Sequence, residues 1–168
     1  TVAAARRPDR VRPTLRPRRA HEPMAPRAAV SKPMDSVSIV WFKRDLRVHD
    51  HAPLVRAARS GRVLPVLIVE PELWRQPDAS ARQYGFFRES ALELAAALAA
   101  RGAPLVVRVG EAVGILADLV RIHGVAAVHS HEETGNDWTY ARDRRVAARL
   151  RDLGVRWHEH RQFGVVRG

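Results

Sequence analysis

Five short strand-like runs, the first four of them mostly apolar, alternate with amphipathic stretches along the chain from Val37 onward. β-branched and aromatic residues are frequent in these runs, which is typical of buried strands. The runs are Val37–Phe42, Val63–Val69, Leu105–Val109, Val125–Val128 and Val155–His160. Strands that alternate with helices need crossover connections, so the pattern predicts a parallel sheet. Five strands are too few for an eight-fold barrel, and we therefore expect an open, doubly wound α/β sheet with helices on both faces.

The first two stretches between these runs predict helices with recognisable starts. Asp50 is placed to cap a helix that would end at Ser60. Ser80 and Gln83 fit a capping box, in which a hydroxyl and an amide satisfy backbone N–H groups at the helix start. Behind them, apolar side chains recur at steps of three and four residues, as on one face of a helix. These residues are Tyr84, Phe87, Ala91, Leu94 and Leu98.

Two more helices are expected, over Ala112–His123 and over Trp138–Leu153. The side chains of the first that should face the core are Leu116, Leu119 and Ile122. Those of the second are Val146, Leu150 and Leu153. The other side of the second helix carries three arginines, Arg142, Arg145 and Arg149. We interpret this side as a solvated face, and a surface that tracks phosphates is the alternative.

The order of the strands in the sheet does not follow from periodicity. The commonest order for strands of this kind is 3-2-1-4-5. With that order, the loops Lys43–Asp50 and Ser130–Asp137 leave neighbouring strands and flank one crevice. Ligands of doubly wound sheets bind in this crevice, at the carboxyl ends of the strands. The two loops are also the most polar of the domain, so we predict the functional site between them.

The first 35 residues differ in composition from the rest of the chain. They hold nine of the 29 Lys and Arg residues but three of the 18 Asp and Glu residues, together with many Pro and Ala residues. Such a segment has too little apolar surface to order itself, so we expect a disordered basic tail over residues 1–35. We interpret the tail as a leader without function, and a nucleic-acid-binding arm is the alternative. No clear targeting signal or membrane-spanning run is present, and we expect a cytoplasmic protein.

Candidate chemistry is concentrated in the two polar loops. In the first loop, Asp45 stands among three cationic residues. It would either form an ion pair with Arg47 or, together with these cations, face an anionic ligand or a partner domain. In the second loop, Asn136 and Asp137 follow two glutamates, and either of them suits a helix cap.

Histidine pairs two residues apart occur twice, at His129 and His131 and at His158 and His160. Such pairs share a strand face and suit metal binding, but they arise by chance in a chain with eight His residues, so we expect no metal site. The chain has no Cys, no Gly-x-x-x-x-Gly-Lys loop, no dinucleotide-binding Gly pattern and no Gly-x-Ser-x-Gly elbow. These absences argue against several enzyme classes and favour a ligand-binding domain.

The segment Val40–Asp50, with the sequence VWFKRDLRVHD, resembles the opening of DNA photolyases and cryptochromes. In that family a first strand ending in Trp-Phe leads into Arg-Asp-Leu-Arg, and an Asp then caps the first helix. Weaker similarities extend the resemblance to about residues 37–166. They lie at Val63–Pro71, Phe87–Leu92, Leu105–Gly110 and Glu132–Asp143.

The resemblance implies the N-terminal α/β domain of a photolyase. In the family this domain holds a light-harvesting antenna, which is a folate, a deazaflavin or a flavin, in a cleft shared with a larger helical domain. The helical domain binds FAD and the DNA lesion and performs the lyase chemistry. We therefore expect a fragment: the α/β domain over residues 36–161, the start of a linker over residues 162–168, and no catalytic residue of its own.

The expected function is thus the antenna domain of a DNA photolyase, a flavoprotein that repairs pyrimidine dimers in DNA under blue light. A cryptochrome-type photoreceptor and a stand-alone nucleotide-binding domain are the alternatives. By loop position and by resemblance, the residues expected to contact the antenna are Arg44, Asp45, Glu132 and Asn136. Arg47 and Asp50 are expected to structure the first loop. The identity of the antenna and the type of lesion stay open.

Overall fold

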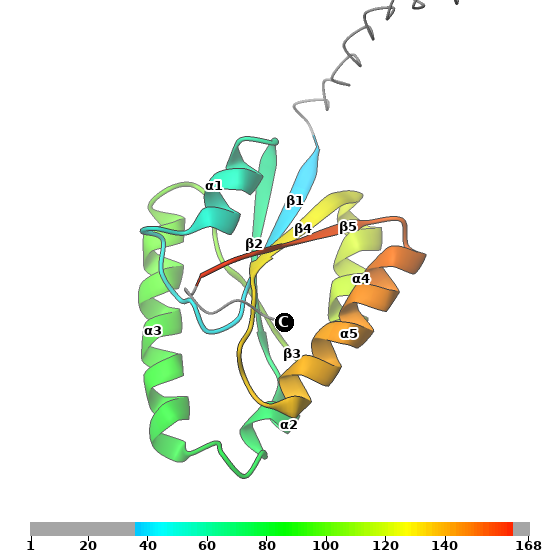
Figure 1. Ribbon diagram of the computed structural model, residues 1–168. Helices are drawn as coiled ribbons and strands as arrows, with labels where there is room; N and C mark the ends of the chain where they lie inside the picture. The colour runs from blue at the N-terminus through cyan, green and yellow to red at the C-terminus, as the bar shows by residue number, and fades with distance from the viewer. Residues whose placement is uncertain (1–35, 163–168) are drawn as a thin grey trace, which may run out of the picture. The chain divides into compact units, whose positions relative to one another are not determined.

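A computed structural model describes residues 36–162, so the basic tail expected over residues 1–35 and most of the expected linker lie outside the described range. Within that range the elements are β1 (Val37–Phe42), α1 (Ala52–Ala58), β2 (Arg62–Val69), α2 (Pro71–Trp74), α3 (Ala81–Ala99), β3 (Val106–Val109), α4 (Ala112–His123), β4 (Val125–His131), α5 (Asp137–Asp152) and β5 (Arg156–His160) (Figure 1). The short helix α2 is an element that the sequence pattern does not predict. None of these helices combines the length and the apolar character needed to cross a bilayer.

The five strands are all parallel and lie in the order β3-β2-β1-β4-β5, which confirms the predicted doubly wound sheet. The central strand β1 pairs with β2 on one side and with β4 on the other, so that Val40 lies beside both Pro65 and His129. The chain fills one half of the sheet up to β3 and then returns past β1 to fill the other half. The carboxyl ends of β1 and β4 therefore meet where the winding reverses, which is where ligands bind in such folds.

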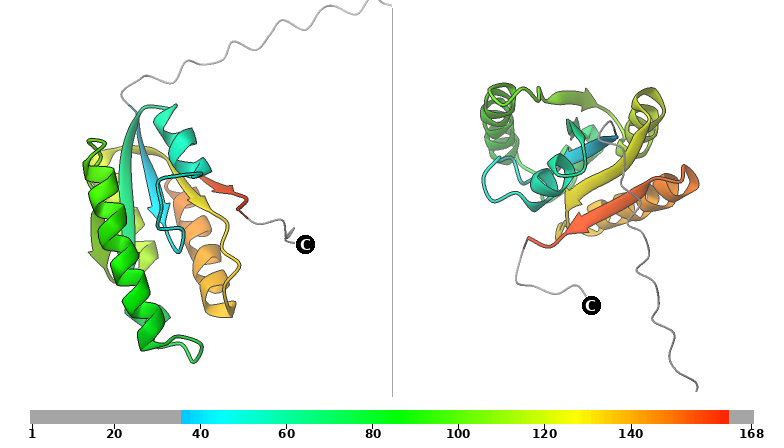
Figure 2. Two further views of the ribbon diagram at one scale, coloured as in Figure 1. Left: turned by 90° about the vertical axis from the view of Figure 1, so that its left-hand side faces the viewer. Right: turned by 90° about the horizontal axis from the view of Figure 1, so that it is seen from above.

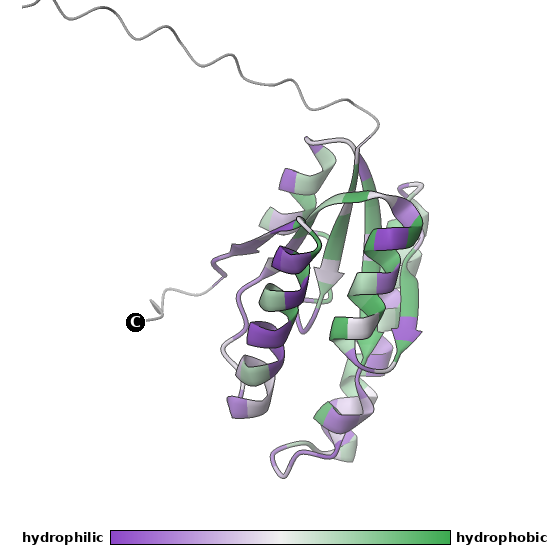
Figure 3. Ribbon diagram, turned by 90° about the vertical axis from the view of Figure 1, so that its right-hand side faces the viewer, coloured by the Kyte–Doolittle hydropathy of each residue, from purple (hydrophilic) through white to green (hydrophobic). Residues whose placement is uncertain are grey.

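The two faces of the sheet carry separate apolar clusters, because successive residues of a strand point to opposite sides. Ile39 and Trp41 of β1 belong to the cluster that α4 and α5 cover, and Val40 and Phe42 belong to the cluster that α1 and α3 cover. All four side chains are buried. Figure 2 shows the helices on both sides of the sheet, and Figure 3 shows mainly apolar strands beside a largely hydrophilic α5.

The start of α1 differs from the prediction. His51, and not Asp50, is the N-cap: Nδ1 of His51 accepts the backbone N–H of Leu54 at 3.1 Å. Asp50 is exposed, and its backbone has a φ of 47°, in the left-handed region. The helix also ends at Ala58, earlier than expected, and the backbone N–H of Arg59 there donates to the carbonyls of Val55 and Ala57.

The inward side of α4 is also partly different from the prediction. Leu116 and Leu119 are buried as expected, but Ile122 is 72% exposed and Val120 is buried in its place. At about 100° per residue, position 122 lies roughly 120° around the helix from Leu116, whereas position 120 lies about 40° away. Tyr84, expected in the apolar stripe of α3, is 41% exposed and lies at the edge of that stripe.

Gly124 ends α4 with a left-handed backbone, at φ 58° and ψ 46°. A residue with a Cβ is strained in this conformation, so we expect Gly124→Ala to lower the free energy of unfolding by about 1 kcal/mol. Gly85 lies inside α3 with open space around a Cβ. Gly85→Ala is the matched control and should raise the free energy of unfolding by about 0.5–1 kcal/mol. Urea unfolding measures both values, and a change of the same sign in the two variants would contradict this role of Gly124.

Candidate functional site

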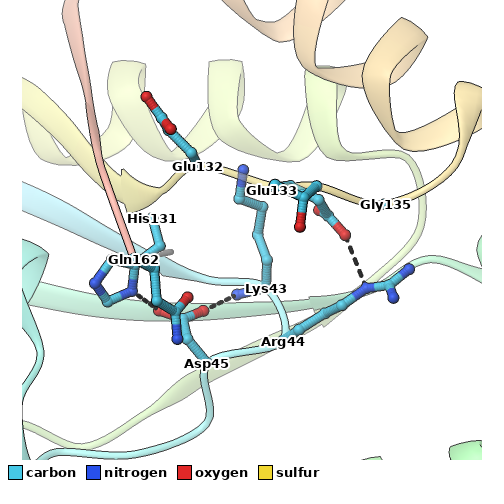
Figure 4. A pocket seen from close by; sticks show the side chains of 9 residues that line it. Lys43, Arg44, Asp45, His131, Glu132, Glu133, Gly135 and Gln162 are labelled. Carbon is cyan, nitrogen blue, oxygen red and sulfur yellow. Dashed lines mark hydrogen bonds and ion pairs between the residues drawn. The ribbon is translucent and has the colours of Figure 1, made fainter. Parts of the chain in front are cut away.

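The loops that follow β1 and β4 meet at the carboxyl end of the sheet, as the strand order requires. Together they line a pocket of about 160 Å³, which Figure 4 shows from close by. The first loop contributes Lys43, Arg44 and Asp45, and the second contributes residues 131–135. The second loop is shorter than predicted, because β4 continues to residue 131 and α5 begins at residue 137. Gln162, which follows β5, completes the pocket.

Asp45 is a buried carboxylate that three donors surround. Its Oδ2 atom lies 2.6 Å from Nε2 of His51 and 2.6 Å from Nδ1 of His131, and its Oδ1 atom accepts the backbone N–H of Lys43 at 3.1 Å. Burial by itself would raise the pKa of Asp45, but the hydrogen bonds from His131 and His51 outweigh burial and hold the pKa far below its usual range. Asp45 therefore stays ionised, and its partners are histidines rather than Arg47.

His51 connects the cap of α1 to this carboxylate. Because Nδ1 of His51 accepts the N–H of Leu54, the ring proton lies on Nε2 and is donated to Asp45. Asp45, His51 and His131 offer three potential metal ligands within 4.8 Å of one another. A metal ion bound at Nε2 of His51 would displace this proton and break the helix cap. The 2.6 Å contacts are also shorter than the separation of about 3.3 Å between the ligands of a tetrahedral zinc ion, so the group suits hydrogen bonding.

A second buried group centres on Arg142 of α5, whose side chain is 2% exposed. Its Nη1 atom donates to Glu70 at 2.6 Å, its Nη2 atom to Glu133 at 2.5 Å and its Nε atom to Asp143 at 3.0 Å. Burial by itself would lower the pKa of Arg142, but the three carboxylates outweigh burial and raise the pKa. The guanidinium thus joins the end of β2, the loop after β4 and α5 into one ionic cluster.

The interpretation of Arg142 as part of a solvated face was wrong. Arg142 lies four residues before Val146 and eight before Leu150, so all three lie on the buried side of α5. Arg145 is exposed and Arg149 is half-buried. The four-residue spacing was visible in the sequence, but the arginine charge led to the opposite assignment.

Lys43 is a second buried cation, with a side chain that is 4% exposed. Its Nζ atom lies 3.1 Å from Asp143 and 3.9 Å from Glu159. It also lies 5.0 Å from the ring centroid of Trp41 and 5.4 Å from that of Trp157. Carboxylates inside the protein therefore compensate the charge of Lys43, and this charge serves the fold rather than a ligand.

Arg44 is the cation of this loop that solvent reaches, since its side chain is 59% exposed. Its Nε atom lies 2.8 Å from Oε1 of Glu133, a contact between charges in which no N–H is directed at the oxygen. Figure 4 shows the Arg44 side chain reaching across to Glu133. Because the Arg44 guanidinium is largely exposed and Glu133 already accepts from Arg142, Arg44 remains able to bind an anionic ligand.

A second and larger pocket, of about 280 Å³, shares Arg44 with the first. Its other walls come mainly from α2 and the first half of α3, and they include Trp74, Phe86 and Phe87. The rings of Trp74 and Phe87 lie 5.1 Å apart between centroids. Nε1 of Trp74 is buried and has no hydrogen-bond partner among residues 36–162. An aromatic wall with an unpartnered donor suits a flat ring that carries acceptor atoms at its edge.

The four residues predicted to contact an antenna are divided between these pockets. Asp45 and Glu132 line the first pocket, Asn136 lines the second, and Arg44 lines both. Figure 4 shows the Glu132 carboxylate pointing away from Asp45. The crevice predicted between the two loops is therefore present, but its polar side chains do not converge on one point.

Asn136 also has a structural task that the sequence suggested. Its Oδ1 atom accepts the N–H of Thr139 at 3.1 Å and so caps α5. Its Nδ2 atom lies 2.9 Å from both carboxylate oxygens of Asp78, in the segment before α3. Asp78 and Trp74 escaped the sequence analysis, because nothing local indicates that their segment folds back against the two loops.

Arg47 and Asp50 were expected to structure the first loop. The two residues are in contact, because the Arg47 side chain reaches the backbone of Asp50. Nε of Arg47 donates to the carbonyl of His49 at 3.2 Å, and Nη2 donates to the carbonyl of Asp50 at 3.3 Å. The Arg47 guanidinium thus spans the loop just before the cap of α1.

Comparison with known proteins identifies relatives of this chain. The family model for DNA photolyase matches residues 38–166. A blue-light photoreceptor of Arabidopsis thaliana is 34% identical over 139 residues, which cover 79% of this chain and 30% of the relative. The deoxyribodipyrimidine photo-lyase of Escherichia coli is 34% identical over 122 residues, which cover 68% of this chain and 25% of the relative.

The fold is similar to that of solved structures as well. One of them is an archaeal photolyase from Sulfolobus tokodaii, which was crystallised with two FAD molecules. It matches with a TM-score of 0.68 and 28% sequence identity, over 74% of this chain and 29% of that chain. The chain thus spans less than a third of the length of each of these relatives.

Proposed function

Because this chain belongs to the DNA photolyase family, we propose that it is the antenna-binding α/β domain of a light-dependent DNA-repair protein. The proposed partner of the whole protein is DNA that contains pyrimidine dimers. FAD and the repair chemistry are assigned to a helical domain that the 168 residues do not include. The chain itself would then supply a binding site for a chromophore and no catalytic residue.

The observation that carries this proposal is the second pocket, whose composition fits an antenna chromophore. Folates, deazaflavins and flavins combine a flat ring that has acceptor atoms at its edge with a negatively charged tail. Phe86 and Phe87 would pack on the ring, and the N–H of Trp74, which is now buried, would donate to its edge after the Trp74 side chain turns towards the pocket. Arg44, at the boundary of the two pockets, would balance the charge of the tail. When bound, the antenna absorbs light and passes its excitation energy to FAD.

The first pocket has a supporting role in this proposal. Asp45 accepts from His51 and His131, so no oxygen of this carboxylate needs a ligand. Lys43 is likewise engaged by Asp143. We therefore assign to Asp45 a positioning role: it holds the loop after β1 so that Arg44 stands between the two pockets.

A cryptochrome-type photoreceptor is the second candidate, because the plant blue-light photoreceptor and the Escherichia coli photo-lyase are equally similar to this chain, at 34% identity. The same antenna pocket would serve either function, because signalling and repair differ in what FAD does next. Blue-light repair of a dimer-containing oligonucleotide, measured with a longer protein that includes the FAD domain, separates the two. Turnover of the dimer supports the lyase, and its absence in a protein loaded with reduced FAD supports the photoreceptor.

Titration of the full chain with FMN, FAD and methenyltetrahydrofolate tests the pocket, with chromophore fluorescence as the readout. We expect saturable binding of at least one of these probes. Trp74→Phe keeps an aromatic ring but removes the N–H donor, and should weaken binding about five- to tenfold, as expected for the loss of one hydrogen bond. Tyr140→Phe, in an exposed residue of α5 outside the pocket, is the control and should leave the affinity unchanged. Equal affinities of wild type and Trp74→Phe would contradict the proposed site.

A further inference from the structure

Four histidines form a two-by-two array on the β4–β5 strand pair. The parallel register places His129 beside His158 and His131 beside His160. Because residues two apart on a strand point to the same side, the four rings lie on one face of the sheet. Apart from His131, none of them lines either pocket of the proposed antenna site. The array is therefore a feature that the proposed function does not use.

The rings of this array are close together. The centroid of the His129 ring lies 4.8 Å from that of His158 and 5.5 Å from that of His160, and both pairs are stacked. Nδ1 of His129 and Nε2 of His160 share a hydrogen bond of 3.2 Å, and an ion bound by both nitrogens would replace the proton between them. Two nitrogen ligands of a tetrahedral zinc ion, with bonds of about 2.0–2.1 Å, stand roughly 3.3 Å apart. These two nitrogens are thus already at the separation that one shared ion requires.

We propose that His129, His158 and His160 bind a divalent ion of the zinc, copper and nickel group, for which imidazole is a preferred ligand. His158 would supply a third nitrogen by rotation of its side chain, because its ring now lies nearly parallel to that of His129, at 16°. The strand β5 lies at the edge of the sheet, and His158 and His160 are half-buried. An ion can therefore enter from solvent, and water can complete its coordination.

The surroundings of the array determine how tightly an ion binds. Burial lowers the pKa of His160, and the neighbouring charges of His131, His158 and Arg56 act in the same direction. The lowered pKa favours the neutral ring, which is the form that binds metals. Arg56 also repels a dication, however, and the array has no thiolate ligand. We therefore expect weaker binding than in a closed structural zinc site with Cys ligands.

Isothermal titration of the untagged full chain with zinc chloride and with nickel chloride, in a buffer that does not bind metals, tests the proposal. The expected result is one ion per chain. His129→Gln and His160→Gln should each weaken binding at least about tenfold, since even indirect neighbours of a metal contribute that much. His21→Gln and His123→Gln change histidines outside β4 and β5 and should leave the affinity unchanged.

A further variant separates the array from the group formed by Asp45, His51 and His131. His51→Asn keeps a residue that can cap α1 but removes one nitrogen from that group. We expect metal binding in this variant to be unchanged, and its loss would place the ion at the Asp45 group and overturn the proposal. Absence of saturable binding, or full affinity in both His129→Gln and His160→Gln, would overturn it as well.

A measurement on the unaltered chain does not depend on how any variant folds. Ring nitrogen resonances of histidine, observed by nuclear magnetic resonance, report directly which nitrogen binds an ion. Addition of zinc should shift Nδ1 of His129 and Nε2 of His160 and leave both nitrogens of His123 in place. Shifts confined to His51 and His131 would assign the ion to the Asp45 group instead.

Discussion

Replacing Arg142 by Met should lower the free energy of unfolding by about 3–5 kcal/mol. Met occupies a comparable volume, but it leaves three buried carboxylates without the cation that holds them together. These carboxylates are Glu70, Glu133 and Asp143. A domain of ordinary stability has a free energy of unfolding of about 5–15 kcal/mol, so the loss would be a large fraction of the total. Arg142→Lys should not restore the wild-type value, because an ammonium cannot reproduce the fork that contacts three carboxylates.

The effect of Arg142→Met should also depend on pH, through Glu70. Burial is the largest influence on Glu70 and raises its pKa, while the charge of Arg142 acts in the opposite direction. Without Arg142, only the hydrogen bond from the backbone N–H of Ala112 still opposes burial. A carboxyl group whose pKa is raised in the folded state begins to destabilise the protein as the pH rises past its unfolded value, and does so fully above the raised value. The loss of stability should therefore be larger at pH 8 than at pH 5.

Urea unfolding of Arg142→Met and of Arg145→Met, at both pH values, measures this effect. Arg145 lies on the same helix with a side chain that is 59% exposed, 3.9 Å from Glu111. Its replacement should change the free energy of unfolding by less than about 0.5 kcal/mol. Similar small losses in the two variants would show that the ionic cluster contributes little to stability.

Asp45→Asn should lower the free energy of unfolding by about 3 kcal/mol at pH 7. The Asn amide is nearly the same shape, but its NH₂ group would have to replace one oxygen of a carboxylate that faces three donors. His51 cannot adapt, because the N–H of Leu54 holds its ring in the tautomer that donates towards Asp45. At least one buried donor then stays without an acceptor.

The pH dependence of the wild type gives an independent check on Asp45. Its pKa is lowered on folding, so its contribution to stability is fully present above the unfolded value of about 3.9 and is lost as the pH falls below it. Asp45→Asn lacks this titration. The difference in stability between wild type and variant should therefore shrink between pH 5 and pH 3.

Asp118→Asn is the control for Asp45, since its side chain is 62% exposed and pairs with Arg121 on the surface of α4. We expect a change of less than about 0.5 kcal/mol, with little dependence on pH. If wild type and Asp45→Asn lose stability in parallel as the pH falls, another group and not Asp45 is responsible for acid unfolding.

Much of the fold was predictable because hydrophobic periodicity is a local property of the chain. The alternation of strands with helices indicated a parallel sheet, and the usual winding of such sheets placed the loops after β1 and β4 side by side. The position of the candidate site followed from that topology. Local rules were less successful where two residues competed for one task, as His51 and Asp50 did for the cap of α1.

The sequence by itself therefore determined most of the elements and the parallel character of the sheet, and the winding that such sheets usually adopt then indicated which loops form the crevice. Only the tertiary structure decided which polar side chains are buried there and which partners they have. Arg142 meets Glu70, Asp45 meets His131, and the histidines of β5 meet those of β4. The first two of these pairs are separated by 72 and 86 residues along the chain. A charged side chain is stable inside a protein only if its partners arrive with it, and those partners are set by strand register and helix packing, which no local pattern encodes.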